Sequence, residues 1–157
     1  MTATDWANAD PVFWSWLAGF IDGDGCFTLS RRTRDDALFG ANFNGMISIS
    51  QYKNRSWVCD YIKKITGIGT VINITTTSNF GDSSGKRWLV SRQSDIISII
   101  EMIYSHLIIK KNDGRLLLKA INLMSTRKTQ YYTRGVFDEL DKIYHKMKKG
   151  AGGMRKK

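Results

Sequence analysis

The chain has 157 residues, and lysine and arginine exceed the acidic residues so far that the formal net charge is +10. This excess attracts polyanions, most commonly nucleic acid, although a basic protein with no such partner would show the same balance. A hydrophobic content of 42% is sufficient for one folded domain, and the two cysteines, Cys26 and Cys59, lack the spacing of a zinc site. The apolar stretch at 12–21 is too short to span a bilayer, and no basic segment of a signal peptide precedes it.

The first predicted helix covers residues 11–24, because Asp10 suits the N-cap, proline is favoured at the first helical position, and Gly25 ends the pattern. Further along the chain, alternating and helical periodicities predict strands and helices in turn. The predicted strands cover 26–32, 42–50, 70–77 and 88–91, with a polar turn at 79–85. The predicted helices cover 54–66, 94–109 with Ser94 as its N-cap, 113–124 and 133–149.

The order α-β-β-α-β-β-α, followed by further helices, is typical of an α+β fold with an antiparallel sheet packed on helices. Residues 1–147 are expected to form a single domain, and the basic, glycine-rich tail at 148–157 is expected to be disordered. The helical spacing of Trp14, Trp16 and Trp57 predicts that they face the interior, and His106 is expected to be a core or interface residue.

The end of the first helix combines two features that cost stability. Gly19 and Gly23 lie on one helix face, and a glycine inside a helix costs about 0.5–1 kcal/mol relative to alanine. Asp22 and Asp24 fall in the last turn, where the helix dipole is negative. The glycines make sense if another backbone comes very close, and the carboxylates make sense if a cation lies at the helix end.

One face of the predicted sheet is rich in short polar side chains and arginine. Such a face can simply be solvated, but these donors and acceptors suit base edges better than the usual lysine and glutamate. The predicted DNA-contacting residues of the first hairpin are Thr28, Ser30, Arg32, Arg34, Asn42, Asn44 and Ser48. In the later strands they are Asn73, Thr75, Lys86 and Arg87, although a register slip would exchange the faces of Asn73 and Thr75 with those of Ile72 and Ile74.

Residues 17–25 read LAGFIDGDG, which resembles the motif of the LAGLIDADG homing endonucleases. The departures are Phe20 for leucine and Gly23 for alanine, and both are conservative for close packing. The element order extends the resemblance over nearly the whole chain. It implies a saddle-shaped antiparallel sheet packed on helices, and a site-specific, metal-dependent DNA endonuclease that hydrolyses phosphodiester bonds.

The resemblance also implies which residues carry the chemistry. Asp24 would bind Mg²⁺ with help from the backbone carbonyl of Gly23, and Mn²⁺ or Ca²⁺ would also fit the site. Gln51 would orient a nucleophilic water, and Arg55 would balance phosphate charge. A basic residue that reaches the active-site waters matches Lys110, with Lys111 as its rival. Asp22 is expected to be structural rather than a ligand.

A single motif in the chain implies a homodimer, because single-motif members of the family pair this helix with its symmetry mate. The predicted interface residues are Trp16, Gly19, Phe20 and Gly23. Two copies of Asp24 would then lie side by side, each cutting one strand of a pseudo-palindromic target and leaving short 3′ overhangs. The alternative is a monomer that buries the glycine face against its own core.

Two other functions remain open on the same fold. The first is an intron RNA-splicing maturase, which would bind structured RNA and would not depend on Asp24. The second is an inactive DNA-binding regulator, although the set Asp24, Gln51 and Lys110 argues against it. Single-motif members of the family are typically intron-encoded, often in chloroplasts or mitochondria, and a protein encoded in the organelle would need no transit peptide.

Overall fold

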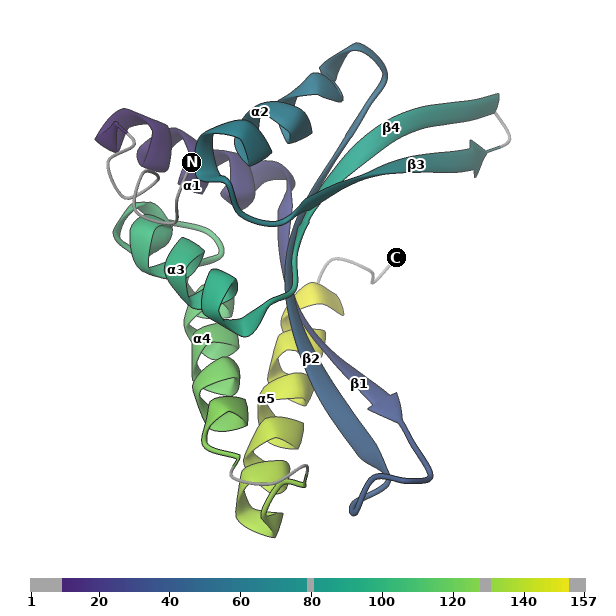
Figure 1. Cartoon of the computed structure of the whole chain (residues 1–157), viewed down its shortest axis with the longest axis vertical. Coiled ribbons are helices and arrows are strands. Elements are labelled where there is room, and N and C mark those ends of the chain that lie inside the picture. Colours follow the sequence, from purple (N-terminus) through teal and green to yellow (C-terminus); the bar gives the residue numbers. More distant parts are fainter. Residues whose placement is uncertain (1–9, 79–80, 128–130, 153–157) are drawn as a thin grey trace.

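The structure, a computed structural model, describes residues 10–78, 81–127 and 131–152. Its order of elements agrees with the order predicted from the sequence (Figure 1). The strands are β1 (Gly25–Thr33), β2 (Ala41–Tyr52), β3 (Thr70–Ser78) and β4 (Gly81–Val90). The helices are α1 (Pro11–Asp24), α2 (Trp57–Thr66), α3 (Gln93–Ile103), α4 (Lys111–Ser125) and α5 (Arg134–Gly152), with short 3₁₀ segments η2 (Lys53–Arg55) and η3 (Tyr104–His106).

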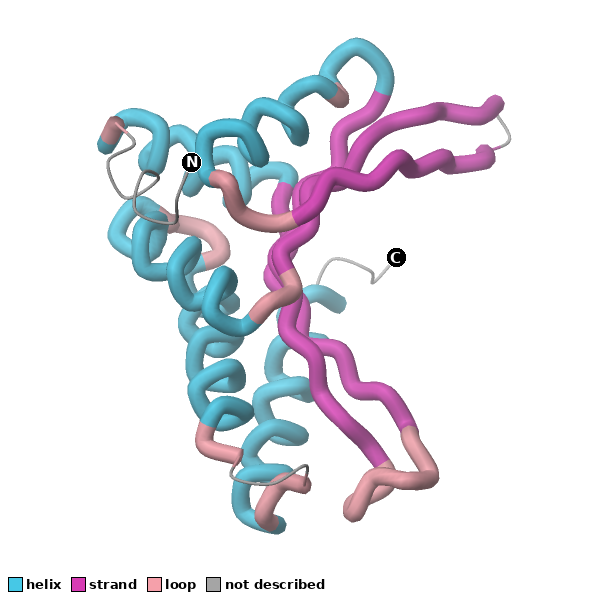
Figure 2. The backbone as a smooth tube through the Cα atoms, in the orientation of Figure 1, coloured by secondary structure: helices cyan, strands magenta, loops and turns pink. Residues whose placement is uncertain are grey.

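The four strands form one antiparallel sheet in the order β1-β2-β4-β3. Strand β2 is the centre of this arrangement, since Ile47 pairs with Phe27 of β1 and also with Val90 of β4. The helices gather on one side of the sheet, and the β1–β2 and β3–β4 hairpins extend away from it in different directions (Figure 2). The described chain therefore leaves the opposite face of the sheet open.

The core lies between the sheet and the helices. Alternate strand residues, among them Phe27, Ile47 and Trp88, are buried on the helix side, as the alternation predicted. Helix α4 approaches the sheet closely at Gly45, where a Cβ would lie 2.5 Å from the Cδ1 of Ile121. The absence of a side chain at this position therefore lets α4 pack directly on β2.

Some predicted boundaries were wrong. Strand β4 begins at Gly81, so most of the predicted polar turn at 79–85 is strand; residues 79 and 80 lie outside the described chain. Helix α3 begins at Gln93 with Arg92 at the cap, so Ser94 lies inside the helix. Helix α5 continues to Gly152, and the predicted disordered tail is thus helical from 148 to 152, while 153–157 lie outside the described chain.

Several aromatic residues lie at the surface, contrary to the helical-spacing prediction. Trp14 is buried as expected, but Trp16 is 40% exposed and Trp57 is 61% exposed. His106 is exposed in η3, because α3 ends at Ile103 and the chain turns there, so the core half of its prediction was wrong and an interface position stays a prediction. In the described residues, none of the helices has the length and apolar character needed to cross a bilayer.

Candidate active site

Helix α1 passes into β1 without an intervening residue, and this junction positions Asp24. The amide of Gly25 donates to the carbonyl of Ile21, which completes the last helical turn just as the chain becomes extended. A Cβ at Gly25 would lie 2.7 Å from the Cα of Ile21, so only glycine fits at this step. The carboxylate of Asp24 is therefore held, exposed, at the point where the helix meets the sheet.

Gln51 lies beside Asp24 because β2 runs antiparallel to β1 and Gly25 pairs with Ile49. The Nε2 of Gln51 donates a 2.8 Å hydrogen bond to the Oδ2 of Asp24. Gln51 is 5% exposed, which makes it one of the few buried polar residues of the described chain. The two residues that the sequence placed in one site are thus brought into direct contact.

Lys110 reaches the same helix end from the segment before α4. Its Nζ donates to the backbone carbonyls of Ile21 at 2.9 Å, Asp22 at 2.7 Å and Gly23 at 3.4 Å. A lysine in this position satisfies the free carbonyls of the last turn and complements the helix dipole. Lys111 instead lies over the ring of Tyr104, 5.1 Å from its centroid, so Lys110 is the lysine at the motif.

Asp22 has a structural position, as expected. Its buried carboxylate accepts hydrogen bonds from the backbone amides of Ile108 at 2.7 Å, Ile109 at 3.2 Å and Lys110 at 2.8 Å. Burial raises the pKa of Asp22, but these amides together with the charge of Lys110 outweigh it, and the net pKa lies below the usual value. The carboxylate is thus committed to the protein rather than to a cation.

Arg55 ends η2, the 3₁₀ segment that follows β2, and its side chain is exposed. Lys53 enters this segment with a φ of 54°, the left-handed region that non-glycine residues seldom adopt. Within the described chain, no hydrogen bond or ion pair joins Arg55 to Asp24, Gln51 or Lys110. Its predicted role in balancing phosphate charge stays a prediction.

The donor set fits a magnesium-like cation only in part. The exposed carboxylate of Asp24 and the carbonyl of Gly23 are hard oxygen ligands at the negative end of a helix, as Mg²⁺ prefers. No cluster of three or more His, Cys, Asp or Glu side chains that would hold a metal occurs among the described residues. Since Mg²⁺ is commonly bound by one or two carboxylates together with waters and substrate phosphates, one chain supplies a fraction of a complete site.

The open face of the sheet carries most of the predicted polar residues of the first hairpin. Cross-strand partners share a face, and the pairs Ser30–Asn44, Arg32–Asn42 and Thr28–Met46 lie opposite the buried Phe27 and Leu29. Arg34 lies in the loop after β1, where its guanidinium forms a two-pronged contact with Asp36, at 2.9 and 2.6 Å. Both side chains of this ion pair are exposed.

The second hairpin divides the other predicted contacts between two faces. Arg87 lies on the open face, where its Nε donates to the Oγ of Ser50 at 2.9 Å. Lys86 lies on the opposite face and pairs with Asp60 of α2 at 2.6 Å. Because Asn73 pairs with Lys86, and Thr75 shares the face of Asn73, both lie on that opposite face as well. Of these four residues only Arg87 lies on the open face, and DNA contact by Asn73, Thr75 and Lys86 stays a prediction.

The open face of β3 instead carries residues that sequence reasoning set aside. Ile72 pairs with Arg87, and Ile74 follows on the same face. Ile72 is 40% exposed. Strand alternation predicts that Ile72 and Ile74 share a face, but which face of the sheet this is depends on the pairing of β3 with β4.

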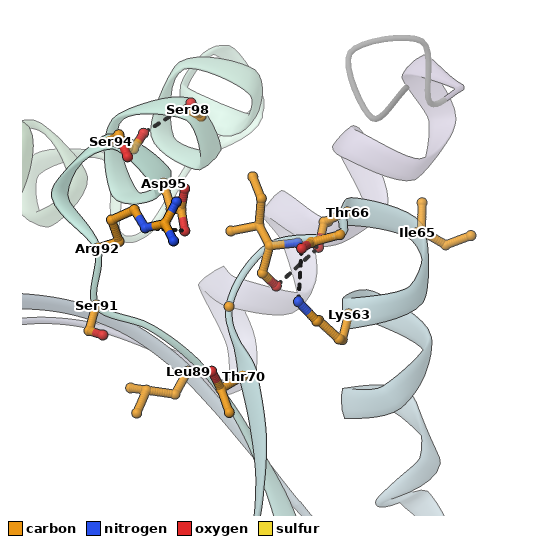
Figure 3. A pocket seen from close by; sticks show the side chains of 13 residues that line it. Lys63, Ile65, Thr66, Thr70, Leu89, Ser91, Arg92, Ser94, Asp95 and Ser98 are labelled. Carbon is orange, nitrogen blue, oxygen red and sulfur yellow. Dashed lines mark hydrogen bonds and ion pairs between the residues drawn. The ribbon is translucent and has the colours of Figure 1, made fainter. Parts of the chain in front are cut away.

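A pocket of about 610 Å³ lies elsewhere, between the end of α2 and the start of α3 (Figure 3). Its two basic side chains are already engaged, Lys63 with the carbonyl of Gly67 at 2.8 Å and Arg92 with Asp95 at 3.8 Å. The lining residues include none of the Asp24, Gln51 and Lys110 group. The pocket is therefore not the candidate active site.

The glycine face of α1 is open in the single chain. Among the described residues, a Cβ added to Gly19 or Gly23 would have no neighbouring atom within 4 Å. Beside the glycines, Trp16 stacks on Phe20 with ring centroids 5.3 Å apart, and both remain partly accessible. The alternative in which the protein's own core buries these glycines was therefore wrong, and the face is available to another chain.

Residues 17–112 match the family model described as LAGLIDADG endonuclease, which covers more than half of the chain, and the protein belongs to this family. A curated relative is the DNA endonuclease I-CvuI of Chlorella vulgaris, 28% identical over 119 residues that span 76% of this chain and 70% of the relative.

Two solved structures show the same fold. One is the homing endonuclease I-CvuI in complex with the I-CreI target in the presence of Mg, with its DNA uncleaved. It has a TM-score of 0.73 and 23% identity over 93% of this chain and 86% of the other. The other is the archaeal intron-encoded homing endonuclease I-Vdi141I complexed with DNA, with a TM-score of 0.74 and 21% identity over 88% and 84% of the two chains. The α+β fold expected from the resemblance is thereby confirmed.

Proposed function

We propose that this protein is a homing endonuclease that cleaves both strands of a long, pseudo-palindromic DNA target by metal-dependent phosphodiester hydrolysis, leaving short 3′ overhangs. The contact between Asp24 and the buried Gln51 carries this proposal, because it puts an exposed carboxylate and a polar amide at the end of the family's motif helix. The relatives whose names describe DNA endonucleases support it.

Four residues at the end of α1 and around it would have separate roles in catalysis. Asp24 and the carbonyl of Gly23 would hold a divalent cation, which supplies charge stabilisation and an acidified water when bound. The Nε2 of Gln51 donates to the Asp24 carboxylate and so fixes its orientation. The side-chain oxygen of Gln51 would accept a hydrogen bond from the reacting water. The ammonium of Lys110 places a positive charge beside the scissile phosphate, where negative charge develops.

Recognition would use the open face of the sheet. Its short polar side chains and arginines would reach base edges in the major groove, which admits a two-stranded ribbon. The basic residues of α5, among them Lys142, Lys146 and Lys149, would add contacts to phosphates with no sequence preference. This division predicts affinity that falls steeply with salt and specificity that depends on the hairpins.

Two copies would join along the open glycine face of α1, with Trp16, Gly19, Phe20 and Gly23 in the interface. The space beside both glycines supports this arrangement. It would bring two Asp24 carboxylates to one pair of strands and complete the partial ligand set that one chain offers. Light scattering tests the assembly: a monomer at micromolar concentration without DNA would contradict it.

Cleavage of a plasmid library with a randomised target, in the presence of Mg²⁺, tests the function directly. We expect double-strand cuts by the wild-type protein and none by Asp24→Asn. The control is Asp138→Asn, which removes a half-buried carboxylate of α5 that pairs with Arg134 at 3.1 Å. This variant should cleave normally. Equal behaviour of wild type and Asp24→Asn would overturn the proposal. Tight binding of structured intron RNA without cleavage would favour a maturase, and specific DNA binding without cleavage a regulator.

A further inference from the structure

We propose that Asp22 is a positioning residue for Lys110: it holds both the backbone and the ammonium of this lysine against the last turn of α1. This inference rests on the proposed nuclease function, in which Lys110 acts beside Asp24. It assigns to the first carboxylate of the motif a task distinct from metal binding, namely to fix the place of a catalytic cation that comes from a distant part of the chain.

The carboxylate of Asp22 acts on the backbone of the segment that precedes α4. Its Oδ2 accepts from the amides of Ile108 and Ile109, and its Oδ1 accepts from the amide of Lys110. Both oxygens are thus engaged by three successive amides that are 86 to 88 residues away in sequence. A neutral side chain cannot offer two charged acceptor oxygens to such a row of donors.

The side chains of this segment cannot anchor it in the same way. Leu107 is buried, but Ile108 is 84% exposed and Ile109 is 76% exposed, so neither packs into the core of the single chain. Helix α4 begins only at Lys111. Between the buried Leu107 and the start of α4, the chain is therefore held to α1 by its three amides on the Asp22 carboxylate and by the ammonium of Lys110 on the carbonyls of the last turn.

The ammonium of Lys110 returns to the same residue. Its shortest hydrogen bond, 2.7 Å, goes to the backbone carbonyl of Asp22, while the Lys110 amide donates to the Asp22 carboxylate at 2.8 Å. One residue thus holds both ends of the lysine, and the side chain spans the distance between them. Loss of the carboxylate would free the backbone end and allow the ammonium to move relative to Asp24.

A double-mutant cycle separates this role from a general effect on folding, because a residue that acts only through Lys110 has nothing to act on once the ammonium is gone. We would measure single-turnover cleavage by wild type, Asp22→Asn, Lys110→Met and the double variant, at saturating DNA. We expect Asp22→Asn to slow cleavage by about 10-fold or more when Lys110 is present, but by less than about 3-fold when the protein already carries Lys110→Met. Equal loss in both backgrounds would overturn the proposal.

Amide hydrogen exchange gives a readout that requires no activity. In the wild-type protein the amides of 108–110 should be protected although they lie outside the helices, and Asp22→Asn should accelerate their exchange while Lys110→Met leaves it nearly unchanged. The control is Asp113→Asn, which removes another carboxylate next to this segment, in the first turn of α4. It should leave the exchange of 108–110 as in the wild type.

The two measurements distinguish this inference from the proposed function. Rapid exchange of 108–110 in the wild type would overturn the anchoring role whether or not the protein cleaves DNA, and it needs no variant to fold. Protected amides in a protein that cuts no DNA would instead overturn the proposed nuclease, and with it the catalytic part of this inference. Protection combined with a non-additive cycle would support both.

Discussion

The Nε2 of Gln51 and the Oδ2 of Asp24 are 2.8 Å apart, and this hydrogen bond joins the end of β2 to the end of α1 across 27 residues of sequence. The donor is nearly fully buried and the acceptor is exposed, so the bond connects the core to the surface where a cation would bind. Replacement of Gln51 therefore tests both the fold and the charge of the site.

We expect Gln51→Glu to destabilise the protein more than Gln51→Met does. The methionine variant loses one hydrogen bond to a charged group, worth about 1.5–3 kcal/mol, whereas the glutamate variant adds repulsion between two carboxylates. Millimolar Ca²⁺ should restore much of the loss in Gln51→Glu and little in Gln51→Met, because a cation between two carboxylates binds only the folded state. Urea unfolding with and without Ca²⁺ measures both effects, and an equal response of the two variants would contradict a cation site at Asp24.

Gly19→Ala should have opposite effects on the single chain and on the dimer. Alanine favours a helix by about 0.5–1 kcal/mol over glycine, and no atom of the described chain lies within 4 Å of a Cβ at Gly19, so the isolated subunit should become more stable. The added methyl group would separate the two helices, and the dimer dissociation constant should rise by about 10-fold or more. Analytical ultracentrifugation and thermal unfolding check the two parts.

Gly45→Ala provides the contrast for that experiment. Its Cβ would collide with Ile121 in the core, so it should destabilise the subunit and leave the subunit–subunit contact itself unchanged. If Gly19→Ala instead behaves like Gly45→Ala, the glycine face is buried within the subunit rather than between subunits.

Arg87→Ala and Lys86→Ala remove one positive charge each from adjacent residues on opposite faces of β4. Arg87 is on the open face, so its loss should weaken specific DNA binding by about 1–3 kcal/mol. Lys86 pairs with Asp60 of α2, so its loss should cost much less affinity and change mainly the packing of α2. Fluorescence anisotropy over a range of salt concentrations compares them, and a larger effect of Lys86→Ala would reverse the assignment of the faces.

The stability contributed by Asp22 should depend on pH. The amides it accepts hold its folded-state pKa below the unfolded value of about 3.9, so the contribution is complete above that value and is lost as the pH falls through the lower folded pKa. Asp22→Asn should therefore be less stable than wild type at pH 7, and the difference should narrow below about pH 4. A difference that is the same at pH 7 and pH 3 would show that the ionised carboxylate is not what the amides bind.

The local parts of this site follow from local sequence. The cap at Asp10, the helix that ends in Asp24 and the strand alternation around Phe27 all reflect interactions within a few residues, and periodicity predicts them. Gln51 and Lys110 were identified through the resemblance to the family, because nothing near them in sequence distinguishes a buried glutamine or a helix-end lysine from an ordinary one. In the structure both residues form hydrogen bonds with the end of α1.

The parts that sequence reasoning missed depend on distant partners. The faces of Asn73 and Thr75 are set by their register with β4, and a shift of one residue exchanges them. His106 looked like a helix residue because the apolar periodicity continues past Ile103, where the helix actually ends. The task of Asp22 depends on amides more than 80 residues away, which no local pattern contains.

The direct passage from α1 into β1 links the position of the sheet to the position of the helix. Asp24 ends the helix and Gly25 begins the strand, so the angle at which two copies of α1 cross would also set the separation of their two sheets. The length of DNA between the two half-sites would then be a property of the helix crossing and not of the hairpins. Changes in the hairpins can alter which bases are read, while the spacing of the half-sites stays the same.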